Sequence, residues 1–290
     1  MEAFAHQVLS GLASGLIYAS LALALVMVHR STHRLNFAQG EMAMFATYVA
    51  WALIDAGLPY WGAFAVAVVL AFVSGAAIQH LLIRRVRSDS VLPVVVVFIG
   101  LLISFNSLAG WIFSYQLKVF PSPFAELPMF AQTWVAPHAL GAALVILLIL
   151  VALVVFFRFT LLGLKMRAVA QNPVSSRLLG IRVDAMLALG WGLAAAIGAV
   201  AGMMVAPIVY LEPSMMSGIL LYAFAAALIG GIDSPAGSVV GGLLVGVLEN
   251  LLGAYVIGND LKLVVALVVI VATLLVRPAG LFGSAPVVRV

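Results

Sequence analysis

The chain has 290 residues, of which 65% are hydrophobic and only 8% are charged, and its formal net charge is +4. A mean hydropathy of +1.24 excludes an ordinary soluble domain. Apolar runs near the ~20 residues that cross a ~30 Å hydrocarbon core predict an all-α, polytopic membrane protein. The absence of cysteine excludes a disulfide framework and a thiolate metal site.

The expected membrane spans are the apolar runs of the sequence. In chain order they lie at about 8–28, 38–56, 62–83, 91–113, 139–157, 186–210, 217–231, 238–256 and 261–276. The first run lacks a preceding basic residue and a cleavage site, so we expect a retained helix rather than a signal peptide. The run at 217–231 is short and is followed by GGIDSPAG, which predicts a broken or re-entrant segment. We therefore expect about eight or nine spans in a single membrane domain at 1–290.

Lys and Arg are unevenly distributed between the connections. If the N-terminus lies outside, twelve of the 14 Lys and Arg residues fall in cytosolic connections or in the C-terminal tail, leaving Lys118 and Lys262. An excess of Lys and Arg marks the cytosolic side of a membrane protein. The N-terminus is therefore predicted outside and the C-terminus in the cytosol, and the longest cytosolic loop is predicted at about 158–185.

Small residues spaced four apart predict the helix contacts. Lipid tails are as apolar as leucine, so membrane helices associate by close approach of their backbones. The glycine pairs with this spacing are Gly11 and Gly15, Gly198 and Gly202, Gly237 and Gly241, and Gly242 and Gly246. Glu249 and Asn250 continue the last two rows, so we expect their side chains to face the bundle or a partner.

Four of the polar side chains within apolar segments need an explanation first, because a central charge costs roughly 2.5–3.5 kcal/mol on insertion scales. We regard them as candidates for lining a passage: Glu41, Asn106, Glu249 and Asn250. Each also has a structural interpretation. For Glu41, about one turn inside the second segment near its cytosolic end, the favoured interpretation is an interfacial carboxylate attracted by the helix dipole. Glu249 is equally explained as a hydrogen-bonded packing residue, and for Asn106 the packing interpretation is the favoured one.

Several chemistries are not expected in this chain. His29 and His33 have the spacing of a two-histidine metal site, but arginines flank them and no carboxylate lies between them. We therefore expect a structural or interfacial role for both and no metal site. No G-x-x-x-x-G-K-[ST] loop occurs, so ATP is not bound by a P-loop in this chain. No nucleophile arrangement is visible, and no catalytic residue or resident cofactor is predicted.

The stretch LKMRAVAQNPVSSRLLGIRV at 164–183 is polar in an otherwise apolar chain. Asn172 is a good N-cap, Pro173 suits the first helical position, and Gly180 suits the C-terminal cap. A helix of about two turns is therefore predicted. Because so short a helix is marginal in water, it should dock on another surface. That surface is either a soluble partner or the acidic headgroups of the membrane.

Three blocks of the sequence resemble the permease subunits of ABC importers for branched-chain amino acids. In chain order they are GLIYASLALALVMVHRSTHRLNFAQGEMAMFATYVA, then MRAVAQNPVSSRLLGIRV with LGWGLAAAIGAVAGMMVAP, and LIGGIDSPAGSVVGGLLVGVLENLL. The length resembles the shorter of the two permease types of such importers. The chain departs from the family pattern after Pro173, where Val174, Ser175 and Ser176 stand in place of an acidic residue and alanines.

The resemblance implies a multi-pass subunit of the bacterial inner membrane. Its partners would be a second permease subunit, a periplasmic substrate-binding protein and two ATP-binding subunits, which bind ATP and Mg²⁺. The helix from Pro173 to Leu179 would be a coupling helix seated in a groove of an ATPase. Val174, Leu178 and Leu179 would supply apolar contacts, and Arg177 would supply polar ones.

The loop at 114–138 is the longest external segment, and we expect it to form part of the surface that receives the binding protein. No residue decides between branched-chain amino acids, other amino acids, urea and short amides as the substrate. The alternative function is a gradient-driven secondary transporter. Such a protein usually carries a relay of carboxylates or histidines at the membrane midplane. Nothing indicates nucleic-acid binding, and the lipid bilayer is an expected partner.

Overall fold

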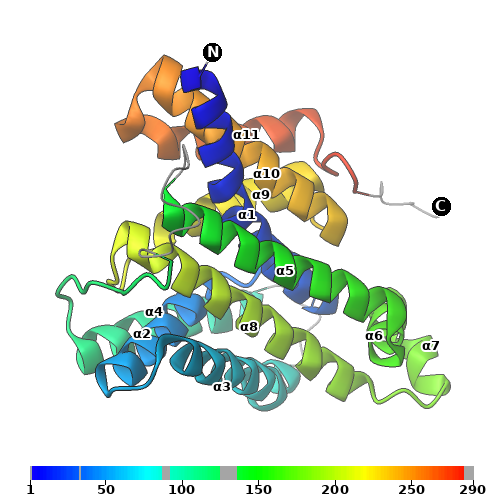
Figure 1. Cartoon of the computed structure of the whole chain (residues 1–290). Helices are drawn as coiled ribbons and strands as arrows, with labels where there is room; N and C mark the ends of the chain where they lie inside the picture. Colours follow the sequence, from blue (N-terminus) through cyan, green and yellow to red (C-terminus); the bar gives the residue numbers. More distant parts are fainter. Residues whose placement is uncertain (1, 33, 87–91, 125–135, 284–290) are drawn as a thin grey trace. The chain divides into compact units, whose positions relative to one another are not determined.

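The computed structural model describes residues 2–32, 34–86, 92–124 and 136–283, and the regular elements within them are all helices (Figure 1). The longer helices are α1 (Glu2–Thr32), α2 (Gln39–Asp55), α3 (Tyr60–Leu81), α4 (Leu92–Phe113), α5 (Pro137–Phe159), α8 (Val183–Val209), α9 (Met216–Gly230), α10 (Pro235–Leu252) and α11 (Lys262–Val276). Two shorter helices, α6 (Leu161–Gln171) and α7 (Pro173–Leu178), connect α5 to α8. The predicted all-α class is confirmed.

Each apolar segment predicted from the sequence lies on a helix. Among the described residues, 6 helical stretches are long and apolar enough to cross a membrane: Glu2–Arg30, Tyr60–Arg85, Leu92–Phe113, Pro137–Phe159, Val183–Val209 and Pro235–Ile257. Helices α9 and α11 are also apolar but shorter. Helix α9 is continuous, and the interruption expected in this part of the chain lies after it, at 231–234.

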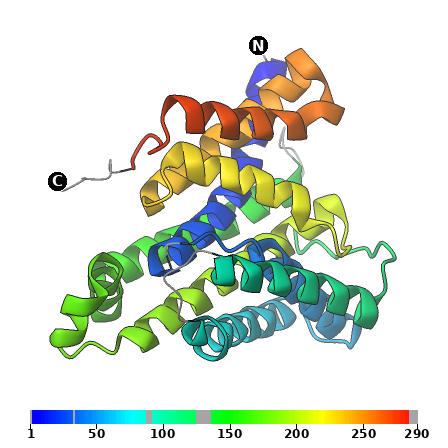
Figure 2. The same cartoon turned by 180° about the vertical axis from the view of Figure 1, so that it is seen from behind.

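The chain divides into two compact units, each built from segments far apart in the sequence. Unit 1 comprises Met1–Val26, Ser122–Leu144 and Ser217–Val290, and unit 2 comprises Met27–Pro121 and Val145–Met216. In unit 1, α9, α10 and α11 lie side by side (Figure 2). Unit 2 contains α2, α3, α4, α6, α7 and α8.

Helix α8 is the centre of unit 2 and packs on both α3 and α2. A Cβ atom placed on Gly75 of α3 would lie 2.6 Å from the Cβ of Ala195 in α8. Three residues along α8, a Cβ atom on Gly198 would lie 2.6 Å from Nε2 of Gln39 in α2. Glycine therefore allows the three helices to approach more closely than side chains would permit.

Helix α10 is the centre of unit 1, and its two adjacent glycine rows face different helices. The contacts are Gly242 with Ala19 and Gly246 with Gly11 and Gly15, all in α1, and Gly237 with Gly230 and Gly241 with Ala226, both in α9. A methyl group at any of these four α10 positions would overlap backbone atoms of the neighbouring helix. The small-residue rows thus hold α1 and α9 against α10 by backbone packing.

Gly202 of α8 tests this packing. A Cβ atom there would lie 2.5 Å from Thr47 Oγ1 and 2.8 Å from Ala43 O of α2. We expect Gly202→Ala to lower the free energy of unfolding by about 1–3 kcal/mol, the usual cost of overpacking, although alanine is the better helix former. Gly100→Ala in α4 is the matched control, because its Cβ would meet nothing within 4 Å. Equal melting temperatures of the two variants in detergent would contradict the packing argument.

Candidate coupling helix and buried polar sites

Helix α7 is a short element with both ends capped. Asn172 Oδ1 accepts a hydrogen bond from the amide of Ser175 at 2.9 Å, and Pro173 begins the helix, where no intrahelical donor is needed. Leu179 is the C-cap, Gly180 follows with a φ of +77°, and the two amides after Leu179 donate back to carbonyls of the helix. This closure is a Schellman motif, which favours glycine at the left-handed position.

The outward side of α7 is apolar. Val174, Leu178 and Leu179 are 70%, 85% and 79% exposed, whereas Ser176 is buried. Arg177 is also exposed. Single exposed leucines are common on proteins, but adjacent ones on one short helix form a patch of the kind that marks an interaction site.

Helix α6 connects α7 to the long helices through packed junctions. Thr160 Oγ1 caps α6 by accepting a hydrogen bond from the amide of Gly163 at 3.0 Å. Gly163 lies against the backbone of Phe156 at the end of α5, so the bend between the two helices is tight. Met166 and Val169 are buried, and α6 contacts both α7 and α8. Helix α7 is therefore attached to α5 and α8 without a loose linker.

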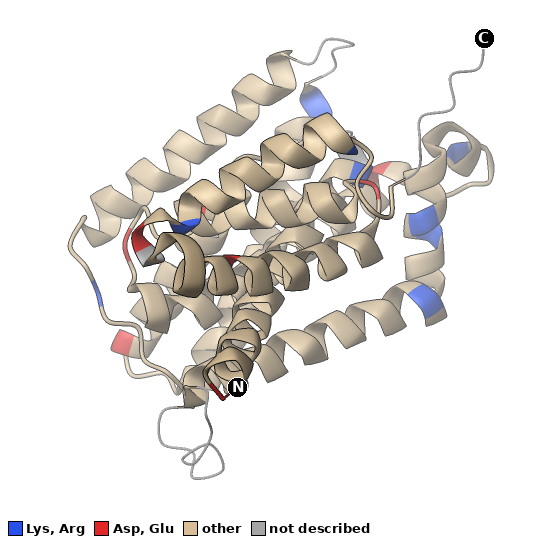
Figure 3. Cartoon of the chain, turned by 90° about the horizontal axis from the view of Figure 1, so that it is seen from above, with Lys and Arg blue, Asp and Glu red and all other residues tan. Residues whose placement is uncertain are grey.

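Basic side chains surround α7. Figure 3 shows Lys and Arg at the end of α5 and along α6 and α7. The exposed ones are Arg158, Lys165, Arg167, Arg177 and Arg182. No Asp or Glu occurs in the sequence between 158 and 183. The surface around the apolar patch is thus positively charged and is complementary to an acidic partner.

Helix α2 begins deep inside unit 2. Asn36 and Gln39, which precede or open the helix, are fully buried, and Gln39 Nε2 donates to Ala194 O at 3.0 Å. Ala194 lies ~17 Å along α8 from Val183, at a rise of 1.5 Å per residue. Asn36 Oδ1 also accepts from the amide of Ala38 at 3.0 Å, so side chains satisfy the backbone where the chain is not helical. The first turn of α2, which contains Glu41, is therefore enclosed by protein.

Glu41 and Asn106, which are far apart in the sequence, lie together in unit 2. Asn106 Nδ2 donates to Glu41 Oε2 at 3.2 Å and to Pro213 O at 2.9 Å. Glu41 is only 7% exposed. One amide therefore joins α2, α4 and the segment before α9. Sequence reasoning missed Pro213 because its contribution is a backbone carbonyl, which leaves no side-chain signal.

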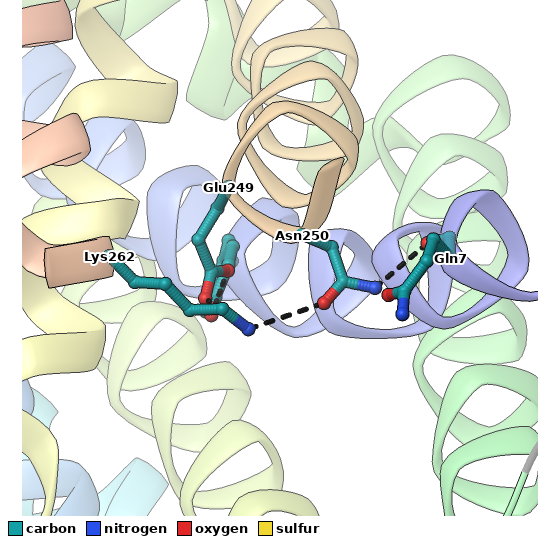
Figure 4. Close-up of polar contacts among 5 residues, drawn as sticks. Gln7, Glu249, Asn250 and Lys262 are labelled. Atoms are coloured by element: carbon teal, nitrogen blue, oxygen red, sulfur yellow. Dashed lines mark hydrogen bonds and ion pairs between the residues drawn. The ribbon is translucent and has the colours of Figure 1, made fainter. Parts of the chain in front are cut away.

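Glu249 and Asn250 take part in a polar network in unit 1 (Figure 4). Glu249 accepts a hydrogen bond from the hydroxyl of Tyr18 at 2.8 Å and lies 3.8 Å from Lys262 Nζ. The same Nζ donates to Asn250 Oδ1 at 3.3 Å, and Asn250 Nδ2 donates to Gln7 O at 2.8 Å. The network joins α1, α10 and α11, and it pairs the Glu249 charge with a cation.

The charge distribution of the sequence indicates only that Lys262 is external, and it does not indicate the ion pair with Glu249. A π-helical turn at Gly253–Ile257 extends α10 before the chain reverses into α11. At Gly253 a side chain would overlap that of Lys262, so the glycine leaves space for the lysine to reach Glu249. The relevant signal in the sequence is the combination of this glycine with a lone lysine at the start of an apolar helix.

Neither polar cluster brings together the ligands of a metal centre. Within residues 2–32, 34–86, 92–124 and 136–283, no three His, Asp or Glu side chains are grouped so that they could hold a metal. His33, one of the two histidines considered above, lies outside the described residues. What the clusters offer is a set of hydrogen-bond donors and acceptors within apolar helices.

The fold defines a multi-pass helical membrane protein, and its family follows from the sequence. The family model described as "Branched-chain amino acid transport system / permease component" matches residues 7–274. The chain therefore belongs to the branched-chain amino acid permease family of ABC transporters. Permeases of this family work with partner subunits.

Relatives from distant organisms match nearly the whole chain. The chain is 30% identical to the high-affinity branched-chain amino acid transport system permease protein LivH of Escherichia coli, over 99% of this chain and 98% of that protein. It is 30% identical to BraD of Pseudomonas aeruginosa, with the same coverage. It is 25% identical to a probable LivH of Methanocaldococcus jannaschii, over 94% of this chain and 91% of that protein.

The ion pair in unit 1 predicts the result of a double-mutant cycle. We expect Lys262→Met to cost roughly 2 kcal/mol of folding free energy, because it leaves the Glu249 carboxylate unpaired; the 24% exposure of Lys262 moderates the loss. Adding Glu249→Gln should restore most of the stability. Denaturant unfolding in detergent measures both effects. Strictly additive losses would show that the two residues do not interact.

Proposed function

We propose that the chain is the permease subunit of an ATP-driven importer for branched-chain amino acids or related small amides or urea, with α7 as its coupling helix. The exposed apolar side of a capped helix between two long helices carries this proposal. Family membership supports the importer assignment. The descriptions of LivH and BraD as branched-chain amino acid permeases support the substrate class.

In this proposal the apolar patch of α7 is buried in a groove of an ATP-binding subunit. Full burial of a leucine side chain contributes ~1.5–3 kcal/mol, so Leu178 and Leu179 alone would account for much of the docking energy. Arg177 and its basic neighbours would pair with carboxylates around the groove. Because α7 has no loose linker, closure of the ATPase pair would move α5 and α8 as rigid elements.

The partners and the orientation follow from the same proposal. Helix α7 faces the cytosol of a bacterium, the N-terminus lies outside the inner membrane, and the uneven distribution of Lys and Arg supports this orientation. Two ATP-binding subunits bind ATP and Mg²⁺ and hydrolyse the nucleotide, while this chain is not an enzyme. A second permease subunit completes the membrane part, and a periplasmic binding protein delivers the substrate.

Replacing the docking leucines should separate the permease from its motor. We expect Leu178→Asp with Leu179→Asp to abolish co-purification of a P-loop ATPase from the native host, because two carboxylates cannot be buried in an apolar groove. The measurement is a pull-down of tagged, detergent-solubilised protein, followed by an assay of ATPase activity in the eluate.

The matched control for this experiment is Leu117→Asp with Val119→Asp. Both residues are similarly exposed, at 65% and 74%, and lie in the segment before Ser122, on the opposite side of the membrane in the proposed orientation. This variant should retain the ATPase. Retention by the α7 variant, or equal loss in both, would overturn the assignment of α7 as the coupling helix.

Glu41 and Asn106 are our candidates for the substrate passage. A zwitterionic amino acid presents an ammonium group, which a carboxylate attracts, and a carboxylate, which amide donors attract. Glu41 stands in the first turn of a helix that begins deep in the unit, next to the Asn106 amide. Glu249 and Asn250 are bound to Lys262 and Gln7, which favours a role in holding helices together.

The external loop is our candidate surface for the binding protein. Residues 125–135 of this loop lie outside the described residues. Before them, Lys118 forms an antiparallel bridge with Leu211, and its Nζ lies 4.2 Å from the ring centroid of Trp51. Tyr115, Leu117 and Val119 are exposed beside this fixed point. The anchoring supports a preformed docking surface.

Asn106→Ala tests the passage. We expect uptake in reconstituted vesicles to fall roughly tenfold, the scale of one lost charge-assisted hydrogen bond, while the ATPase still co-purifies. Ser107→Ala, one residue along α4 and exposed, is the control and should transport normally. If Asn106→Ala transports at the normal rate per folded molecule, its amide has no part in the passage.

A further inference from the structure

A basic cleft lies at the end of α3, in unit 2, outside every site described above. Its volume is about 370 Å³, and it is lined by His80, Leu81, Arg84 and Arg85. His80 and Leu81 end α3, and Arg84 and Arg85 lie in the 3-10 turn at Ile83–Arg85 that follows it. Three of the four lining residues can therefore carry positive charge at one end of a membrane-spanning helix.

The charges of this cleft are only partly balanced. Arg84 pairs with Asp184 of α8, with an N–O distance of 3.1 Å and both side chains 43% exposed. In the part of the chain that the structure describes, neither the Arg85 nor the His80 side chain makes a hydrogen bond or an ion pair; the Arg85 amide donates to Leu82 O within the 3-10 turn. The guanidinium of Arg85 is thus available to a ligand in the cleft. The guanidinium of Arg84 is already held in place by the carboxylate of Asp184.

An exposed apolar stripe on α3 leads to the cleft. Val66, Leu70, Val73 and Leu81 are 40%, 49%, 56% and 49% exposed. Their spacing of four, three and eight residues places them on one face of the helix. Arg84 and Arg85 follow Leu81 by three and four residues, so the stripe and the basic cleft are continuous along the helix.

We propose that this cleft binds the phosphate headgroup of an anionic phospholipid whose acyl chains lie along the stripe of α3. A membrane-spanning helix places its ends among the headgroups, and basic pockets at that level favour anionic lipids. Arginine binds phosphate oxygens through two parallel hydrogen bonds, whereas a zwitterionic headgroup cancels the attraction. Because the basic cleft continues into an apolar stripe, it fits a lipid, which has both a phosphate and acyl chains, better than a free anion. The proposal needs α3 to span the membrane and does not depend on the importer function.

Native mass spectrometry of the delipidated full chain tests the proposal. The probes are phosphatidylglycerol, phosphatidylcholine with the same acyl chains, and inorganic phosphate. We expect phosphatidylglycerol to bind more tightly than phosphatidylcholine, and Arg85→Gln to weaken it roughly tenfold, as for one lost charge-assisted hydrogen bond. Phosphatidylglycerol should also raise the melting temperature of the natural chain more than that of the variant.

Arg158→Gln is the matched control, because it removes an exposed arginine from the end of α5, outside the cleft. It should bind phosphatidylglycerol like the natural chain. Arg85→Lys keeps the charge and should retain part of the binding, which separates recognition from misfolding. Equal binding of both lipids, unchanged binding by Arg85→Gln, or an equal loss in Arg158→Gln would overturn the proposal. Binding of inorganic phosphate as tight as that of the lipid would also overturn the proposal.

Discussion

The hydrocarbon core contains no water, so every polar group inside it needs a partner from the protein, and both units depend on this constraint. In unit 2, Asn36 and Gln39 satisfy nearby backbone groups and thereby allow α2 to begin deep among the other helices. In unit 1, Lys262 and Tyr18 compensate the buried Glu249. Glu41, Asn106, Glu249 and Asn250 all have such partners, although a few other buried polar atoms, such as Trp191 Nε1 in α8, have none.

Membrane helices are no more apolar than the surrounding lipid, so the hydrophobic effect does not hold them together. Glycine supplies the attraction that they need. Close backbone approach provides dispersion contacts that lipid cannot provide. Helix α10 shows how this works, because one glycine row meets α1 and the other meets α9. The polar network near the end of α10 joins this helix to α11 through Lys262 and to α1 through Tyr18 and Gln7, so packing and hydrogen bonding both hold α1 against α10.

Helix α7 differs from the long helices in the polarity of its surroundings. In the long helices, Glu41 and Glu249 are buried and many exposed side chains are apolar, whereas around α7 the exposed surface is basic and includes two exposed leucines. Its caps and its short junctions to α6 and α8 hold these leucines in place without help from a partner. A preordered helix loses little conformational entropy on docking, so more of the contact energy is available for binding.

The amino-acid sequence by itself determined the membrane class, the positions of the apolar helices, the glycine rows and both caps of α7. These features follow from local rules: hydropathy over one segment, spacing along one helix, and the preferences of Asn172, Pro173 and Gly180 at helix ends. Only the tertiary structure decided the depth of α2, the meeting of Asn106 with Pro213, and the return of Lys262 to Glu249. Each of these depends on which helices become neighbours, and no periodicity within one segment specifies its neighbours.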